Sequence, residues 1–348
     1  MDIILGISPG IAKLATDLFQ PNESGIHFDK IDGVMFSYAN VKESSREYRK
    51  LWKQGFHRAY KLPTGAKVFL DNGSYNYATD NTYDGSLKAY ENFVEKIQPY
   101  WAAQPRDYIP NTAMSSNEIK SCFERTMGNN EKYCEQDYAM ILHPGPCFEL
   151  YLDAFKKSSM LSKSKFVSLG SILGEKSSFN EKCYHISKAR EAFPDSHLHI
   201  LGIGGTRSMV NLSVALGVDA QDSVGWQMKA QRFGHVISPN PAKGTLNVAT
   251  HLNDRQKLPS KEDYADLEAC ECPYCEKYGL KMLEGNEPKS AVARIGHNLW
   301  HLTDERDQTA EHVKNGTYDE WQKKRNPKLY NIIRYAQERS KVEQLSLF

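Results

Sequence analysis

Eight short apolar runs recur along the chain, and their regular spacing constrains the fold more than any other feature of the sequence. Each run has the length of a buried strand, ends in small or polar residues, and is mostly separated from the next by a segment with helical periodicity. Eight strands that alternate with helices favour a (β/α)8 barrel, with an open, doubly wound α/β sheet as the alternative. The predicted strands are 3–9, 33–39, 67–75, 107–112, 138–145, 166–172, 197–204 and 218–224, and the clearest predicted helices are 86–101, 147–158 and 208–217.

One further pattern favours the barrel over the open sheet. Barrel enzymes build their active sites at the carboxyl ends of the strands, because the loops that follow the strands meet there. We therefore predict a catalytic barrel domain over residues 1–240, with its active site at that face. The polar and small residues that gather at the predicted strand ends are Asp71, Asn111, His143, Ser171, Gly204 and Asp222.

Three cysteines within six residues predict a metal site. Cys270, Cys272 and Cys275 form a C-x-C-x-x-C pattern, and thiolates on such a turn can occupy three corners of a tetrahedron. The fourth ligand is His297 or His301, which are four residues apart and so share one face of a helix. Three thiolates and one imidazole would make a closed, structural zinc site. Three surface thiols without a metal are the alternative.

The remainder of the chain, residues 241–348, is predicted to form this zinc-binding subdomain together with C-terminal helices. The stretch 319–345 has the pattern of a helix interrupted near Pro327. It is also rich in Lys and Arg. Contact with nucleic-acid phosphates and a solvated helix face are equally good interpretations of these basic residues.

The overall composition limits the partners and the location of the protein. The formal net charge is +1, so a nucleic-acid partner would need a local basic patch. No apolar run reaches the length of a membrane span, and the first ten residues, MDIILGISPG, lack a signal-peptide pattern. The seven cysteines are an odd number, which favours metal ligation in a reducing compartment over a disulfide framework. We therefore expect a cytoplasmic protein with no membrane partner.

Two carboxylates at predicted strand ends are the candidate catalytic groups. Asp71 follows the apolar run in VFLDNGSY, and Asp222 ends the eighth predicted strand in VDAQDSVG. Such a pair can support glycosyl transfer, in which one carboxylate attacks the anomeric carbon and the other handles the proton. A cap of a helix or turn is the alternative for each. Asp219 is the local rival of Asp222, but it lies three residues earlier and should point to the opposite face of the strand.

The order of the motifs across about residues 30–301 resembles the tRNA-guanine transglycosylase superfamily. That family has an Asp-Ser-Gly-Gly-Phe-Gln motif, a Gln-Gly-Gly strand end, a Gly-Gly-Leu-x-x-Gly-Glu loop, a nucleophilic Asp near the eighth strand and the same zinc signature. The resemblance implies a pentosyltransferase that exchanges guanine through a covalent Asp–glycosyl intermediate, with Asp222 as nucleophile and Asp71 as general acid/base. The motifs that carry the resemblance are LDNGSYN, ILHPG, SLGSILGE, LGIG, DAQDSV and C-x-C-x-x-C followed by HN.

The resemblance also implies a base pocket and a fourth zinc ligand. Tyr75 would stack on the base, His143 stands where the family has a base-reading Gln, and Asn111 is the nearest match to a second base-binding Asp. Gly170 and Ser171 would offer backbone groups to the edge of the base. For the structural Zn²⁺, His297 matches the family through His-Asn-Leu, so we predict it over His301.

Departures from the family pattern point to one of its branches. The Pro-Thr-Arg that follows the family's nucleophile strand is missing, and Trp226, Lys229 and Arg232 occupy that region. Lys229 and Arg232 would contact phosphates, while Trp226 lines the pocket or packs in the core, with the pocket favoured. The departures resemble the DpdA-type enzymes, which insert 7-deazaguanines such as preQ0 into DNA.

We therefore expect DNA and a free 7-deazaguanine base as partners. A tRNA enzyme with the same chemistry and a non-catalytic nucleic-acid-binding subunit are the alternatives, and retention of both Asp71 and Asp222 argues against the subunit. A homodimer is left open.

Overall fold

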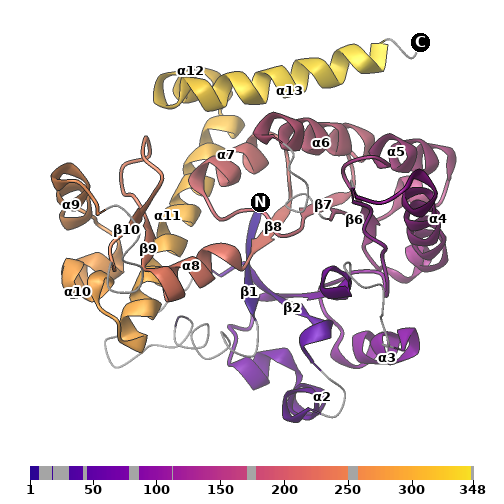
Figure 1. Cartoon of the computed structure of the whole chain (residues 1–348), viewed down its shortest axis with the longest axis horizontal. Coiled ribbons are helices and arrows are strands. Elements are labelled where there is room, and N and C mark those ends of the chain that lie inside the picture. Colours follow the sequence, from indigo (N-terminus) through magenta and orange to yellow (C-terminus); the bar gives the residue numbers. More distant parts are fainter. Residues whose placement is uncertain are drawn as a thin grey trace.

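The computed structural model describes residues 1–7, 18, 31–41, 45–77, 86–111, 113–170, 178–249 and 258–345, the last six of them as backbone only. Within these residues eight parallel strands run in the order β4-β3-β2-β1-β8-β7-β6-β5 (Figure 1), which confirms the predicted (β/α)8 barrel. The strands are β1 (Asp2–Ile7), β2 (Gly33–Ser37), β3 (Lys67–Asp71), β4 (Trp101–Ala102), β5 (Met140–Leu142), β6 (Phe166–Leu169), β7 (His197–Ile200) and β8 (Ala220–Ser223).

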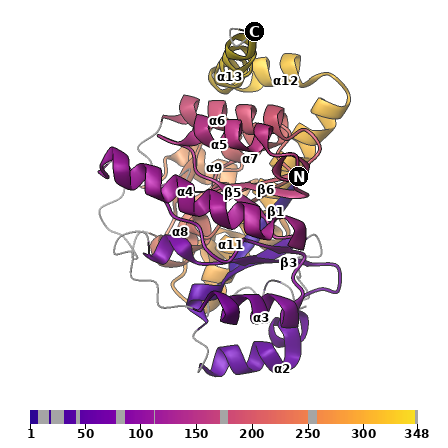
Figure 2. The same ribbon diagram turned by 90° about the vertical axis from the view of Figure 1, so that its right-hand side faces the viewer.

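The ring of strands closes between β4 and β5. Ala103 forms a parallel bridge with Ala139, and the Ala139 N–H donates to the Ala102 carbonyl at 2.7 Å. The barrel helices lie around the strands (Figures 1 and 2), and four short 3-10 turns occur in the described residues. The helices are α2 (Arg46–Tyr60), α3 (Leu87–Ile97), α4 (Ser116–Tyr133), α5 (Phe148–Lys157), α6 (Phe179–Ala192), α7 (Arg207–Ala215) and α8 (Gly225–Phe233), and the 3-10 turns are η1 (Tyr38–Asn40), η2 (Ser74–Tyr77), η3 (Cys134–Gln136) and η4 (Leu161–Lys163).

The fourth strand corrects the sequence prediction. The expected helix 86–101 ends at Ile97, and β4 is formed by Trp101 and Ala102. Residues 107–111 of the expected strand 107–112 belong to a connecting segment, and residue 112 lies outside the described residues. A strand of two residues is too short to show the alternation by which strands are recognised. The backbone N–H of Tyr108 donates to the Thr126 hydroxyl on α4 at 2.8 Å, so it is not part of a strand ladder.

Side chains along each strand alternate between the inside and the outside of the barrel. The inward-pointing ones fill the interior below the carboxyl ends of the strands, where a cavity remains. Side chains that point inward form their own buried cluster. This cluster supports the base of the site and separates it from the opposite end of the barrel. Its members are Ile4, Met35, Phe69, Trp101, Ala103, Ala139, Ile141, Phe166 and Ala220.

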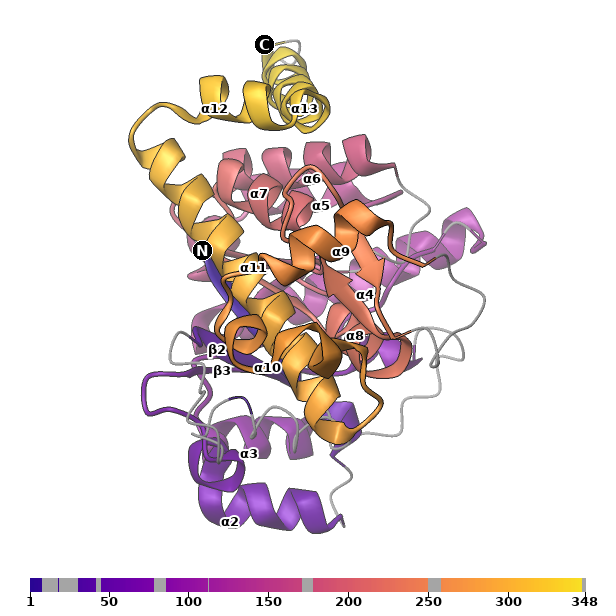
Figure 3. The same ribbon diagram turned by 90° about the vertical axis from the view of Figure 1, so that its left-hand side faces the viewer.

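The C-terminal part packs against the second half of the barrel. α11 lies against α7, α8 and α10 (Figure 3), and α13 packs against α6. α12 and α13 are separated at Asn326, which confirms the predicted interruption near Pro327. Residue 240, the predicted domain boundary, lies in the turn of the hairpin formed by β9 and β10. The elements are β9 (His235–Ile237), β10 (Thr245–Asn247), α9 (Lys261–Glu268), α10 (Pro273–Glu284), α11 (Pro288–Lys314), α12 (Tyr318–Arg325) and α13 (Pro327–Leu345).

Among the described helices, we find none with the length and apolar character that crossing a membrane would require.

Candidate active site and zinc centre

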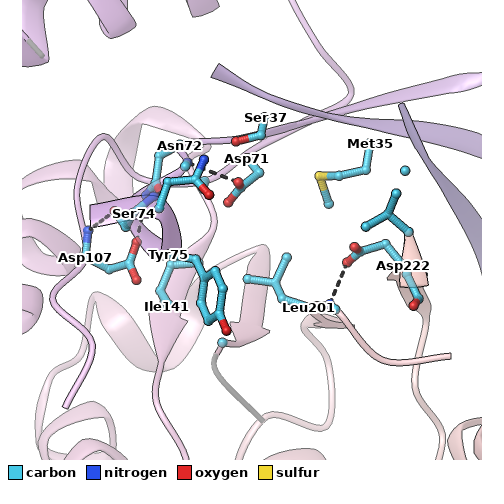
Figure 4. Close-up of a pocket in the computed structure, with 18 of the residues that line it drawn as sticks. Met35, Ser37, Asp71, Asn72, Ser74, Tyr75, Asp107, Ile141, Leu201 and Asp222 are labelled. Carbon is cyan, nitrogen blue, oxygen red and sulfur yellow. Dashed lines mark hydrogen bonds between the residues drawn. The ribbon is translucent and has the colours of Figure 1, made fainter. Parts of the chain in front are cut away.

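A cavity of about 420 Å³ opens at the carboxyl ends of the strands. This volume suits a small organic ligand. Figure 4 shows Asp71 and Asp222 on opposite sides of the cavity, with Tyr75 and Asp107 at its far end from Asp222. The lining residues include Gly6, Met35, Ser37, Asp71, Asn72, Tyr75, Asp107, Ile141, His143, Gly170, Leu201 and Asp222.

Asp71 is held at the end of β3 by a tight turn. Its Oδ2 accepts a hydrogen bond from the Gly73 N–H at 3.0 Å. Gly73 has φ of +83°, and a Cβ there would lie 2.2 Å from the Ala39 Cβ, so only glycine fits the turn. Burial raises the pKa of Asp71 to about 7, and the charges of Asp107 and Asp222 act in the same direction. A carboxyl group with a pKa near neutrality can both donate and accept a proton at physiological pH.

Asp222 enters the cavity from the end of β8. Its side chain is 12% exposed, and its Oδ1 accepts a hydrogen bond from the Gly202 N–H at 3.1 Å. The rival Asp219 lies elsewhere, because its Oδ2 accepts from the Leu198 N–H at 2.8 Å and from Arg190 at 3.0 Å. Of these two aspartates, only Asp222 lines the cavity.

Asp107 is a buried anion that the sequence reasoning missed. Its Oδ1 accepts from the Asn72 amide at 2.7 Å, and its Oδ2 lies 3.0 Å from His143 Nε2. Burial alone would raise the pKa of Asp107, but the contact with His143 and hydrogen bonds from Asn72 and Ser74 outweigh it and hold the pKa below its usual value. Asp107 therefore presents a fixed negative charge to the cavity at neutral pH.

Asp107, and not Asn111, lies in the cavity. Asn111 is exposed, and its Oδ1 accepts from the Ala113 N–H at 2.9 Å, which stabilises the turn before α4. The misplaced fourth strand caused the error, because its predicted end lay at residue 112 whereas β4 ends at Ala102, so the residue sought just after the strand was placed too far along the chain. The signal that would have found Asp107 is a carboxylate shortly after the buried Trp101 run.

The other predicted base-pocket residues fall at different depths. Tyr75 lies at the rim with 67% of its surface exposed, and His143 is buried. Gly170 lines the cavity against His143, and a Cβ on Gly170 would lie 3.0 Å from that ring. Ser171 lies outside the described residues.

The residues after β8 are divided between core and surface. Trp226 does not line the cavity; it is 5% exposed and packs beside Gly205, so the favoured pocket interpretation is corrected to core. Lys229 and Arg232 are exposed on α8, whose first residue, Gly225, lines the cavity.

The second site collects three thiols and one imidazole from α10, α11 and the turn before them. The ligand atoms of Cys270, Cys272, Cys275 and His297 all lie within 4.8 Å of one another, and the four side chains are buried. His297 Nε2 lies 2.8 Å from the Ile237 carbonyl, which assigns its proton to Nε2 and leaves Nδ1 as the ligand. This donor set fits a closed, structural Zn²⁺ site and confirms the predicted cofactor.

His301 lies beside the zinc ligands without completing the set. Its Nε2 is 3.3 Å from the Cys270 Sγ, and its Nδ1 is 2.7 Å from the Arg207 guanidinium. His297 Nδ1 is instead 3.3–3.8 Å from all three sulfurs. The geometry therefore selects His297 as the fourth ligand.

Comparison with known proteins identifies the family to which this barrel belongs, with carboxylates at its mouth and a closed Cys3His zinc site. The family described as queuine tRNA-ribosyltransferase matches residues 75–331, so the chain belongs to that family of transglycosylases. A protein from Saccharolobus solfataricus, named tRNA-guanine(15) transglycosylase, is 28% identical over 140 residues, which cover 39% of this chain. The aligned part spans 24% of that relative's length.

Proposed function

We propose that the protein is a guanine transglycosylase, a pentosyltransferase that replaces guanine in a nucleic acid with a free base. The observation that carries the proposal is the placement of Asp71 and Asp222 on opposite sides of one cavity (Figure 4), with the pKa of Asp71 raised to about 7. Membership of the transglycosylase family supports it. Retention of both carboxylates argues against a non-catalytic subunit.

The chemistry divides into two displacements at the anomeric carbon. In the first, an oxygen of Asp222 forms a bond to this carbon, the glycosidic bond breaks, and guanine departs with a proton from Asp71. In the second, Asp71 accepts the N9 proton of the incoming base. That nitrogen then forms the new glycosidic bond while the electron pair of the ester bond returns to Asp222. Both carboxyl groups are thereby restored to their starting states.

The far end of the cavity supplies groups that can recognise a guanine-like base. Asp107 offers a buried carboxylate for the N–H groups on one edge of the base, and His143 and Gly170 line the wall beside it. Tyr75 at the rim provides an exposed ring on which the base can stack. A 7-deazaguanine such as preQ0 keeps the donor groups that Asp107 would bind, so it is the free base that we propose.

The nucleic acid must deliver a flipped or single-stranded nucleotide to this cavity. Our finer proposal is that the strand is DNA, which rests on the departures around Trp226 and His143 from the tRNA-enzyme pattern. A tRNA substrate is the second candidate, favoured by the names that the family and the archaeal relative carry. Lys229 and Arg232 are the proposed phosphate contacts, since α8 carries them outward from the cavity.

An exchange assay with labelled guanine on DNA and on tRNA tests the proposal. Incorporation into DNA supports the finer proposal, and efficient exchange on tRNA with none on DNA would overturn it in favour of the second candidate. A denaturing gel for the covalent adduct tests the nucleophile. We expect the adduct with wild type and with Asp219→Asn but not with Asp222→Asn. Loss of the adduct in Asp219→Asn alone would refute the assignment of Asp222.

A further inference from the structure

We propose that His199 is a positioning residue that holds Asp222 for attack and stabilises it when it leaves. The inference rests on the proposed function, because it assumes that Asp222 is the nucleophile. His199 belongs to β7, directly beside β8 in the barrel. No feature of the sequence analysis singled it out.

His199 is buried in the barrel interior beneath the cavity. Side chains two residues apart share one face of a strand, so His199 points inward together with Leu201, which lines the cavity above it. His199 is 0% exposed and packs in T-shaped contacts against two interior aromatic rings, Phe69 and Trp101, which stack on each other. Its ring centroid lies 5.0 Å from that of Trp101 and 5.2 Å from that of Phe69.

The imidazole contacts the same Asp222 oxygen that the backbone binds. His199 Nε2 lies 3.1 Å from Asp222 Oδ1, the oxygen that also accepts from the Gly202 N–H at 3.1 Å. Because both contacts involve Oδ1, we assign Oδ2 to the attack on the sugar. The ring is not aligned for a hydrogen bond as it stands. Catalytic hydrogen bonds are often poorly aligned in the free enzyme and tighten in the complex.

Burial explains why a histidine at this position needs a partner. A polar ring in an apolar interior is unfavourable unless it is hydrogen-bonded. Among the residues that the structure describes, His199 Nδ1 has no hydrogen-bond partner, whereas Nε2 faces Asp222. A neutral imidazole carries one N–H, and placing it on Nε2 directs it at the carboxylate.

The Nε2–H donor of His199 would affect the rates of the two displacements differently. In the adduct Oδ1 is the carbonyl oxygen of an ester, and it regains negative charge as the incoming base displaces Asp222. Donors aimed at an oxygen where charge develops lower the barrier of that step. During adduct formation the charge on Oδ1 decreases instead, so the same donors assist less. Loss of His199 should therefore slow the second displacement more than the first.

The test compares His199→Phe and His199→Gln with wild type. We expect His199→Phe to reduce base exchange by about 100-fold, in the range found for removal of one oxyanion donor, and to accumulate adduct on a denaturing gel. His199→Gln can place an N–H near the position of Nε2 and should recover exchange to within about tenfold of wild type. His197→Phe is the matched control, because His197 is the preceding inward-facing residue of β7 and lies further from Asp222.

Base exchange, adduct formation, nucleic-acid affinity and melting temperature together separate the possible outcomes. Nucleic-acid affinity and melting temperature of His199→Phe should stay near those of wild type. Exchange at the wild-type rate in His199→Phe, or a loss of affinity and stability that accounts for all of its defect, would overturn the role. If His199→Phe does not fold, failure of a folded His199→Gln to exchange above the level of Asp222→Asn would overturn it as well. An adduct that persists in Asp222→Asn would instead refute Asp222 as the nucleophile, and absence of base exchange in the wild-type protein would refute the proposed function itself.

Discussion

The zinc centre and the cavity at the barrel mouth both gather buried polar side chains, but they satisfy them in different ways. At the zinc centre four donors converge on one point, and the second nitrogen of His297 is occupied by the Ile237 carbonyl. At the barrel mouth Asp71, Asp107 and Asp222 line a shared cavity, and their proximity helps to raise the pKa of Asp71. The first arrangement closes on itself, whereas the second leaves its three carboxyl groups lining a cavity that can take a ligand.

The two regions are connected through α8. Arg294 on α11 is buried, and its Nε donates to the Ala230 carbonyl of α8 at 2.7 Å. The same guanidinium donates to the carbonyls of Leu283 and Gly285 at the end of α10, each at 2.7 Å. The α10–α11 unit that carries zinc ligands therefore also holds the helix that begins at the cavity. Variants at the zinc centre should therefore lose the fold, whereas variants at the cavity should keep the fold and lose the reaction.

The largest effect is expected at the zinc centre. Cys272→Ala should abolish zinc binding and leave little soluble, folded protein. The apparent binding energy of a structural zinc site is about 10–16 kcal/mol, comparable with the whole stability of a domain at about 5–15 kcal/mol. Metal analysis and thermal denaturation measure the two losses, with Cys134→Ala outside the cluster as the control. Purified wild-type protein that contains no zinc would contradict the assignment.

The next largest effect is expected at Asp222, with the fold preserved. Asp222→Asn keeps the shape of the side chain but removes its nucleophilicity, so exchange should fall by about 10⁴-fold or more. Its melting temperature and zinc content should match those of wild type. Measuring all three quantities on one preparation sharpens the contrast with Cys272→Ala. A loss of zinc in Asp222→Asn would show that the two regions are less separate than the structure indicates.

A smaller and pH-dependent effect is expected from Asp71. Because burial raises the pKa of Asp71 to about 7, the protonated acid that guanine departure needs prevails below that value. Adduct formation should therefore slow about tenfold per pH unit above pH 7. Displacement by the incoming base needs the carboxylate and should slow similarly below pH 7. Single-turnover rates measure both pH dependences, the fall of adduct formation above pH 7 and the fall of displacement below it. Asp71→Asn should remove both dependences. If Asp71→Asn kept the same two pH dependences as wild type, the titrating group would be another residue.

The smallest effect is expected from the basic side chains on α8. The double variant Lys229→Ala and Arg232→Ala should weaken nucleic-acid binding and reduce the slope of log K against log salt by about two units, one for each phosphate contact. Lys323→Ala with Lys324→Ala on α12 is the matched control. An unchanged slope in the α8 variant, with a reduced slope in the α12 variant, would move the phosphate contacts to the C-terminal helices.

The C-terminal basic stretch shows why charge patterns alone left two interpretations open. Arg325 makes a bidentate ion pair with Glu305 at 2.5 and 2.6 Å, so its charge joins α12 to α11. Arg334 pairs with Asp319 on α12. Lys323 and Lys324 remain exposed. The sequence shows which side chains are basic, but the acidic partners of Arg325 and Arg334 become apparent only when the helices are packed.

The sequence by itself determined the features that depend on short-range spacing. Seven of the eight predicted strands overlap observed ones, because buried strands are continuous apolar runs bounded by turn residues. The zinc cysteines lie within six residues, and the two candidate histidines share a helix face, so local spacing reduced the ligand set to the three cysteines and one of two histidines. The packing of α10 against α11 then selected His297. Asp71 and Asp222 could be placed at strand ends for the same reason.

The tertiary structure alone decided the features that depend on contacts between distant segments. The two-residue strand β4 is defined by its pairing with β3, and the position of Asp107 in the cavity follows from that pairing. Its partners Asn72 and His143 come from other strand ends, 35 and 36 residues away along the chain. His199 meets Asp222 across neighbouring strands, and Trp226 is directed into the core. Closure of the barrel brings these groups together, because neighbouring parallel strands are paired by backbone hydrogen bonds between segments that lie far apart in the sequence.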